Sequence, residues 1–382
     1  MDTSRCLARA FLLAALPVAS PLAQSAATTQ DLATDAASLL AETFVEQGLV
    51  GLQATLSLDG EPLLSQAWGH ADLDHDVPLS TDTRMPIASV TKALTGVAYL
   101  RLLERGVVRA DQDVRELVPE WPEKAEGPLL LSHLVNQTHG IRHYRDEVYP
   151  RFFTAHFDTL ADALGVFADD DLLSPPGERF TYSSYAYSLL GLALERAAKT
   201  PFADLLQSEV LDPAGMTRTV PNDPRVPIPG RATCYSFFSP SWPFAPSDDL
   251  LVMPRLDFSY NAAGGNLLST TEDLVRFGER LRTGALLTPT SSAELDASTT
   301  TNSGEPTGWS HGWFVIERGG TLQWRINGSN PGCWAHLRVY PEEGLVLALA
   351  TNTWSPSSRD TKGLLPTMDQ LHELVRTHVS RR

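Results

Sequence analysis

The spacing of apolar residues predicts a helix followed by a hairpin in the N-terminal part of the chain. Over residues 29–48 apolar side chains recur every three or four positions, the period of an amphipathic helix, and Gly48 stands where such a helix would stop. Residues 52–58 and 62–68 have the pattern of strands on either side of Asp59-Gly60, a pair that favours the positive φ angles of a tight turn. We therefore expect two antiparallel strands after this helix.

The rest of the chain shows the same two periods. Further helices are predicted over residues 88–106, 185–199, 270–282 and 364–379, and further strands over residues 312–316, 322–326, 333–340 and 345–351. Residues 221–254 are rich in Pro and aromatic residues without periodicity, which indicates a long surface loop that could border a site.

Strands near both ends of the chain, with helices between them, indicate the fold class α/β, layered as α+β. The expected architecture is one antiparallel sheet flanked by terminal helices, with an inserted helical subdomain. We expect the sheet subdomain from about residues 28–85 and 285–382, and the helical subdomain from about residues 86–284.

Composition narrows the class of partner. The chain has 382 residues, 42% of them hydrophobic and 20% charged, which is typical of a globular protein with a sizeable core. Its formal net charge is −16, and no run of Lys and Arg interleaved with aromatic residues occurs. Both observations argue against nucleic acid as a partner.

The first 27 residues have the order of a secretory signal. Arg5 and Arg9 precede an apolar stretch over residues 10–19, and small residues follow around Ala23 and Ala26. The apolar stretch is about half the length that a bilayer-spanning helix needs, so we expect a cleaved signal peptide and no stable membrane anchor. The mature protein, residues 28–382, is then exported, either periplasmic or secreted.

Two cysteines remain after such a cleavage, Cys234 and Cys333. A disulfide between them would persist in an oxidising compartment, but a disulfide and two buried thiols are equally compatible with the sequence. Two cysteines without close spacing do not indicate a structural zinc site. We expect no metal.

The strongest candidate chemistry lies in Ser89-Val90-Thr91-Lys92. Serine is a poor nucleophile unless a base takes its proton, and residues three apart on a helix share a face, so Lys92 can reach Ser89. The free N–H groups at the helix start would favour an anionic intermediate there. Alone, this tetrapeptide is weak evidence, because it arises roughly once by chance in a chain of this length.

Residues around this tetrapeptide strengthen the assignment. The segment from Met85 to Thr95 resembles the nucleophile helix of the serine β-lactamase and penicillin-binding-protein family. Segments similar to the LACTB-like branch of that family are Trp68-Gly69-His70-Ala71-Asp72, Pro119-Glu120-Trp121-Pro122-Glu123-Lys124, Gly140-Ile141-Arg142-His143-Tyr144, Ala262-Ala263-Gly264-Gly265 and Leu268-Ser269-Thr270. The resemblance implies a β-lactamase/transpeptidase-like fold of two subdomains, a cleft between them, and no cofactor.

The resemblance also points to two further motifs. The second motif of the family, a Tyr two residues before an Asn, corresponds to Tyr182 with Ser184 in place of the Asn. Tyr182 would serve as a proton shuttle if a cation such as Lys92 stabilises its phenolate. Ser184 can still donate a hydrogen bond to substrate.

The third motif, a Lys or His followed by a small residue and Gly on the strand that edges the site, corresponds to Ile326-Asn327-Gly328. Ile326 has no polar group, so the cation of the motif is missing. Gly328, together with Asn327, would let a substrate lie against the strand, and the N–H of Ser329 could pair with that of Ser89 as an oxyanion hole.

Two rival sites are weaker. Gly308-Trp309-Ser310-His311-Gly312 matches the nucleophile elbow of α/β-hydrolases, but that elbow needs a helix after it and a strand is predicted here. His139 and His143 with Glu147 have a spacing that could bind zinc on a helix, but Gly140 interrupts the helix.

We therefore predict a serine hydrolase that works by acyl transfer. Ser89 attacks an ester or amide carbonyl, Lys92 and Tyr182 move the proton, and water releases the acyl group. The substrate is expected to be a peptide, an ester or a β-lactam, and the LACTB-like segments favour a peptidase. Two alternatives remain: a catalytically weakened binding or scaffold protein, because two of three motifs depart from the pattern, and a true β-lactamase.

Overall fold

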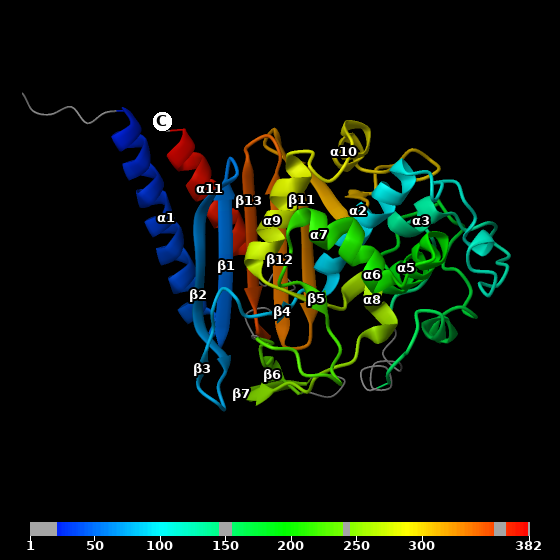
Figure 1. The fold of residues 1–382 in the computed structure, drawn as a ribbon, viewed down its shortest axis with the longest axis horizontal. Coiled ribbons are helices and arrows are strands. Elements are labelled where there is room, and N and C mark those ends of the chain that lie inside the picture. The colour runs from blue at the N-terminus through cyan, green and yellow to red at the C-terminus, as the bar shows by residue number, and fades with distance from the viewer. Residues whose placement is uncertain (1–20, 145–154, 240–244, 355–363, 381–382) are drawn as a thin grey trace, which may run out of the picture.

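The centre of the molecule is an eight-stranded sheet built from both ends of the chain (Figure 1). The computed structural model describes residues 21–144, 155–239, 245–354 and 364–380. The strands run in the order β3-β2-β1-β13-β12-β11-β10-β9, each antiparallel to its neighbour. Their bounds are β1 Gly51–Leu58, β2 Glu61–Asp72, β3 Val77–Pro78, β9 Trp309–Ser310, β10 Trp313–Arg318, β11 Thr321–Asn330, β12 Cys333–Tyr340 and β13 Leu345–Thr351. The predicted antiparallel sheet built from both ends of the chain is confirmed, and two small sheets accompany it.

The predicted hairpin is also confirmed. Asp59 and Gly60 join β1 to β2 with φ angles of 53° and 84°. β1 pairs on its other side with β13, from Leu52 opposite Thr351 to Leu58 opposite Leu345. This pairing joins two strands nearly 300 residues apart in sequence.

Helices cover both faces of the sheet, so its central strands are apolar on both sides. α1 (Pro21–Glu46) and α11 (Leu365–Val379) lie side by side on one face (Figure 1). They pack against the odd-numbered leucines of β13, whereas α9 (Thr271–Arg282) packs on the other face against Val346. Because side chains alternate along a strand, β13 is buried over its whole length.

The helices between the strands gather at one end of the sheet (Figure 1). Their bounds are η1 Ala88–Val90, α2 Thr91–Glu104, η2 Val114–Glu116, α3 Leu131–Val135, η3 Asp162–Val166, α5 Ser184–Ala198, α6 Phe202–Leu206, η4 Gln207–Leu211, α7 Asp212–Ala214, η5 Ser259–Asn261, α8 Ala262–Gly265 and α10 Pro289–Leu295. α2 is buried on nearly all sides, which makes it the axis of this helical region. No helix in the described part of the chain combines the length and apolar character needed to cross a bilayer.

The expectation of a long loop over residues 221–254 was wrong in part. This segment contains β6 (Tyr235–Phe238) and β7 (Pro246–Val252), which form a small sheet with β14 (Thr353–Trp354). β7 is largely exposed, so it lacks the apolar alternation by which a strand is recognised. A third small sheet joins β4 (Met85–Pro86), β8 (Leu267–Ser269) and β5 (Val220–Pro221).

Candidate active site

Ser89 lies in the short turn η1, directly between β4 and the buried helix α2. The residue before it, Ala88, has φ of +43°, a left-handed conformation that costs an L residue about 1 kcal/mol. The turn is held because η1 packs against β11, β12 and α8. Ser89 itself is half-buried, so its hydroxyl is presented at the edge of the core.

The structure brings Ser89, Lys92, Tyr182 and Ser184 together. Ser89 Oγ lies 3.2 Å from Lys92 Nζ and accepts a hydrogen bond from the Tyr182 hydroxyl at 2.9 Å. Lys92 Nζ also donates to Ser184 Oγ at 3.0 Å and to the carbonyl oxygen of Gly264 at 2.6 Å. Lys92 from α2 and Tyr182 from the segment before α5 therefore flank the Ser89 hydroxyl, and Ser184, the first residue of α5, binds Lys92.

Burial sets the protonation states in this group. Lys92 is fully buried, and loss of hydration lowers its pKa to about 7. Burial raises the pKa of Tyr182 to about 12, so its phenol keeps the proton that it donates to Ser89. Near neutral pH a large fraction of Lys92 is therefore an uncharged amine, which is the form that can act as a base.

The three polar contacts of Lys92 Nζ fit the donors and the lone pair of an uncharged amine. A neutral amine has two N–H donors and one lone pair, whereas an ammonium has three donors and no acceptor. The Gly264 carbonyl can only accept, and Ser184 Oγ is free to accept the second N–H. The lone pair then faces Ser89, whose own hydrogen is available because its oxygen accepts from Tyr182.

Strand β11 approaches the nucleophile through Gly328. A Cβ at this position would overlap the carbonyl oxygen of Ile87 and come within 2.9 Å of the backbone nitrogen of Ser89. Only glycine permits this approach, which places the backbone at Gly328 and Ser329 beside Ser89. Because side chains alternate along a strand, the exposed Ser329 side chain points away from the face that Gly328 turns to Ser89, which leaves the backbone of Ser329 as the part nearest Ser89.

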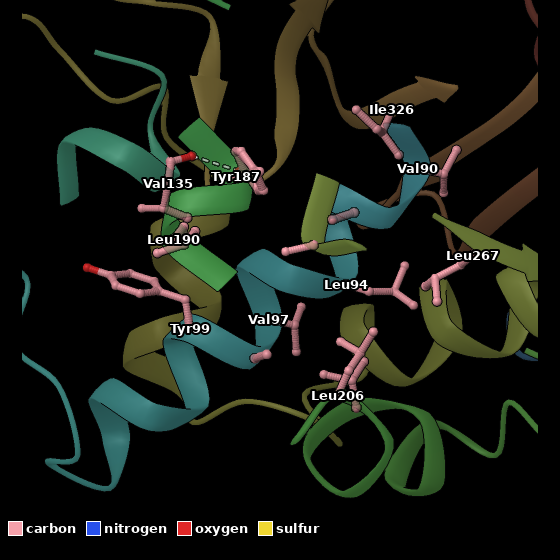
Figure 2. Close-up of a cluster of buried hydrophobic side chains, with 14 of the residues drawn as sticks. Val90, Leu94, Val97, Tyr99, Val135, Tyr187, Leu190, Leu206, Leu267 and Ile326 are labelled. Atoms are coloured by element: carbon pink, nitrogen blue, oxygen red, sulfur yellow. Dashed lines mark hydrogen bonds between the residues drawn. The ribbon is translucent and has the colours of Figure 1, made fainter. Parts of the chain in front are cut away.

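The structure places Asn327 and Ile326 away from this contact. Asn327 points to the α11 face of the sheet, where its Oδ1 lies 2.8 Å from His336 Nδ1. Ile326 faces the other way, is 1% exposed, and belongs to the same apolar cluster as Val90 (Figure 2). The position that holds a cation in the third motif is therefore part of the hydrophobic core.

Sequence reasoning assigned no role to Gly264, although its carbonyl binds Lys92. Gly264 lies in α8, 172 residues beyond Lys92, and a Cβ there would overlap the Asn261 side chain. The consecutive glycines Gly264-Gly265 inside a helical pattern were a signal for such a close approach. His143, Tyr144 and Trp309 form an aromatic wall: the His143 and Trp309 rings lie edge-on to Tyr182, at 5.5 and 5.8 Å, and Tyr144 stacks on His143.

The rival sites do not have accessible chemistry. Ser310 is completely buried in β9, and its hydroxyl donates to the carbonyl of Glu294 at 2.7 Å. His139 uses both ring nitrogens inside the protein, with Gln137 and Ile141, and Glu147 lies outside the described residues. Within the described ranges no group of three or more His, Cys, Asp or Glu is placed to hold a metal ion.

The fold and this constellation define a class of protein, and the comparisons with known proteins agree. Residues 29–365 match the family described as Beta-lactamase, and the chain belongs to this family of serine β-lactamase-like hydrolases. Its fold is therefore β-lactamase/transpeptidase-like, as the sequence predicted.

Individual relatives have different activities in their names. The human serine beta-lactamase-like protein LACTB, mitochondrial, is 28% identical over 309 residues, 63% of this chain and 54% of that protein. The chain thus spans about half the length of that relative. Esterase EstB from Burkholderia gladioli is 29% identical over 377 residues, 84% of this chain and 92% of that protein. The D-amino acid amidase from Ochrobactrum anthropi SV3 has a TM-score of 0.74 at 23% identity, covering 94% of this chain and 100% of that one.

Proposed function

We propose that the protein is an exported serine hydrolase that cleaves ester or amide bonds through an acyl-enzyme on Ser89. One observation carries the proposal: Ser89 Oγ is within hydrogen-bonding distance of both Lys92 Nζ and the Tyr182 hydroxyl. A hydroxyl flanked by a buried amine and a phenol has both a base to activate it and an acid to protonate a leaving group.

In the acylation step the neutral Lys92 takes the proton of Ser89 as its oxygen attacks the carbonyl carbon. The negative charge that develops on the carbonyl oxygen is stabilised by the backbone N–H groups of Ser89 and Ser329, which the close approach at Gly328 supports. Tyr182 then donates its proton to the leaving group. Lys92 returns a proton to Tyr182 through Ser184, which hydrogen-bonds to both.

Deacylation uses the same groups in reverse. Water takes the place of the leaving group and attacks the acyl carbon as Lys92 accepts its proton. The bond between the acyl carbon and Ser89 Oγ breaks, Lys92 returns the proton to Ser89, and the acyl group leaves as an acid. No step needs a metal or a cofactor, because these side chains supply the nucleophile, the base and the acid.

The surroundings of Ser89 favour a neutral substrate. Lys92 makes its three polar contacts inside the protein, and Ile326 is buried, so the described site holds no cation for a substrate carboxylate. Arg325 does not replace one, because neighbouring strand residues point to opposite faces. Neutral esters are therefore the expected substrates, and the relation to esterase EstB over most of the chain supports this choice.

The substrate class is tested by comparing kcat/KM for a neutral p-nitrophenyl ester with that for a chromogenic cephalosporin, which carries a carboxylate. We expect faster turnover of the ester. A kcat/KM for the cephalosporin at least about a hundredfold above that for the ester would identify a β-lactamase instead. We take this threshold because the loss of one preorganised polar contact lowers a rate by about this factor.

The nucleophile is tested by mass spectrometry after incubation with a fluorophosphonate probe. One adduct is expected on the wild type and on Ser310→Ala, the rival serine, and none on Ser89→Ala. An unlabelled wild type would leave the scaffold-protein alternative, and a labelled Ser89→Ala would identify another nucleophile.

Export is the second part of the proposal, and Arg5, Arg9 and the apolar residues 10–19 support it. In a bacterial host we expect protein recovered outside the cytoplasm to lack about 27 N-terminal residues, measured by intact mass. Full-length protein confined to the cytoplasm would contradict this part alone.

A further inference from the structure

The segment that carries Tyr182 and Ser184 is held from behind by one buried side chain. Ser183, the residue between them, is extended, with φ of −147° and ψ of 132°. Its N–H donates to Gln137 Oε1 at 2.7 Å, and its carbonyl accepts from Gln137 Nε2 at 3.2 Å. The backbone of Gln137 adds a third bond, because its carbonyl accepts from the N–H of Thr181 at 2.7 Å. Gln137 thus binds the chain on both sides of Tyr182.

The orientation of the Gln137 amide is set in turn by His139. His139 Nδ1 accepts from the backbone N–H of Ile141 at 2.8 Å, so the hydrogen of the neutral ring is on Nε2. This Nε2–H lies 2.8 Å from Gln137 Oε1, which makes the oxygen the acceptor and leaves the amide nitrogen to face Ser183 O. Burial lowers the pKa of His139 to about 3, so the ring stays neutral at every pH at which the enzyme would work.

The position of Gln137 is itself constrained. It follows α3 and has φ of +59°, a left-handed conformation that non-glycine residues adopt when surrounding bonds hold them. Both Gln137 and His139 are completely buried, and each of their polar bonds is made inside the protein. A flexible surface residue could not fix the height and direction of Tyr182 in this way.

We propose that Gln137 and His139 are positioning residues for catalysis: a buried clamp that holds residues 181–183 extended so that Tyr182 reaches Ser89 and Ser184 reaches Lys92. The inference rests on the proposed function. Because side chains alternate along an extended segment, an extended Ser183 puts the side chains of Tyr182 and Ser184 on the same face, where they reach Ser89 and Lys92. Neither clamp residue touches the substrate or the reacting atoms.

The test is a double-mutant cycle on the rate at which the fluorophosphonate labels Ser89. Gln137→Met keeps the length of the side chain and removes its three side-chain bonds, and we expect labelling to slow by about tenfold or more, since a misplaced proton-transfer group loses a large part of its effect. In a Tyr182→Phe background the same change should slow labelling several-fold less, because one of the two side chains that the clamp positions, the proton donor to Ser89, is already gone.

Gln53 offers a matched control. It is also completely buried, and its amide bonds the backbone of Ser80, Thr83 and Thr271, none of which bonds to the groups around Ser89. Gln53→Met should lower the unfolding temperature but slow labelling to a similar extent with and without Tyr182. If Gln137→Met fails to fold, His139→Gln, which removes the ring's bonds to the Gln137 amide and to the Ile141 N–H but leaves Gln137 in place, gives the same cycle.

The outcomes separate the two proposals. Equal slowing by Gln137→Met in both backgrounds would show a merely structural role and overturn the clamp, while the function stands. A wild-type protein that is not labelled at all would overturn the proposed function and the clamp with it.

Discussion

At the scale of single residues, Lys92 determines how the protein should respond to pH. Because burial lowers its pKa to about 7, Lys92 is protonated below this pH and cannot accept the proton of Ser89. We therefore expect kcat/KM for an ester to rise with pH through an apparent pKa near 7 and to level off above it. Assays from pH 5 to 10 measure this directly.

A titration near 7 is the usual sign of histidine, so His143 is the necessary control. His143 lies beside Tyr182, but burial lowers its pKa to about 3. His143→Asn should leave the apparent pKa near 7 in place. Its disappearance in this variant, or a wild-type rise near the ordinary lysine value of 10.5, would contradict the role given to Lys92.

Ile326 occupies the position of the cation in the third motif, but in the structure it packs in the hydrophobic core. Its side chain is 1% exposed within the apolar cluster that includes Val90 and Leu94. Ile326→Ala should lower the free energy of unfolding by about 2 to 5 kcal/mol, and Ile326→Val by about 0.5 to 1.5 kcal/mol. Urea unfolding measures both, and a cost below about 1 kcal/mol for the alanine variant would show that the site is not tightly packed.

The sequence could locate Ser89 and Lys92 because helical spacing places them on one face, and Tyr182 because a motif marks it. Gly264 and Gln137 could not be assigned in this way. Each acts through contacts with residues that are distant in the chain, and a carbonyl or an amide has no distinctive pattern in a sequence. Asn327 shows the converse, since a residue inside a motif can face away from the site.

At the scale of elements, the contact between β11 and η1 connects the sheet to the nucleophile. Gly328→Ala would place a methyl group against the Ile87 carbonyl and the Ser89 nitrogen, so one of the two elements must move. We expect a loss of stability of about 1 to 3 kcal/mol and a fall in kcat of about a hundredfold or more, since the oxyanion site that we propose is formed by the backbone at this contact. Urea unfolding and ester hydrolysis measure the two effects.

Gly165 provides the comparison for this substitution. A Cβ added there meets no atom within 4 Å, and its φ lies outside the left-handed range. Gly165→Ala should change stability by less than about 1 kcal/mol and leave kcat unchanged. Equal effects at both glycines would contradict the claim that the close approach of β11 to η1 requires glycine at position 328.

Helices and strands could be predicted where burial of one face imposes a regular spacing of apolar residues. The strands β1, β12 and β13 and the helices α9 and α11 are each recognisable from their own residues, since one or both faces are apolar. β6 and β7 were missed because their stability comes from pairing with each other and with β14, which is more than 100 residues away. β7 is also largely exposed, and an exposed strand leaves little trace in the sequence.

At the scale of the whole molecule, the fold brings together chain segments that the sequence leaves unrelated, and the two cysteines are the clearest case. Cys333 begins β12 and is completely buried, while Cys234 precedes β6 and is half-buried. Both line one cavity of about 280 Å³, and the Cys333 thiol hydrogen-bonds with that of Cys234. The question that the sequence left open is thus reduced to the redox state of two adjacent thiols, which are unbridged in the structure.

We expect these thiols to form a disulfide when the protein is exposed to a thiol oxidant. The neighbouring Cys234 thiol and burial raise the pKa of Cys333, so Cys234, which is more accessible, should react first with glutathione disulfide and then be attacked by Cys333, releasing glutathione. The bridge closes a loop of about 100 residues and should raise the free energy of unfolding by up to about 4.7 kcal/mol. Intact mass, which falls by two hydrogens, and urea unfolding with and without a reductant measure it. Cys234→Ser should respond to neither treatment, and formation of intermolecular dimers by the wild type would show that the two thiols do not meet.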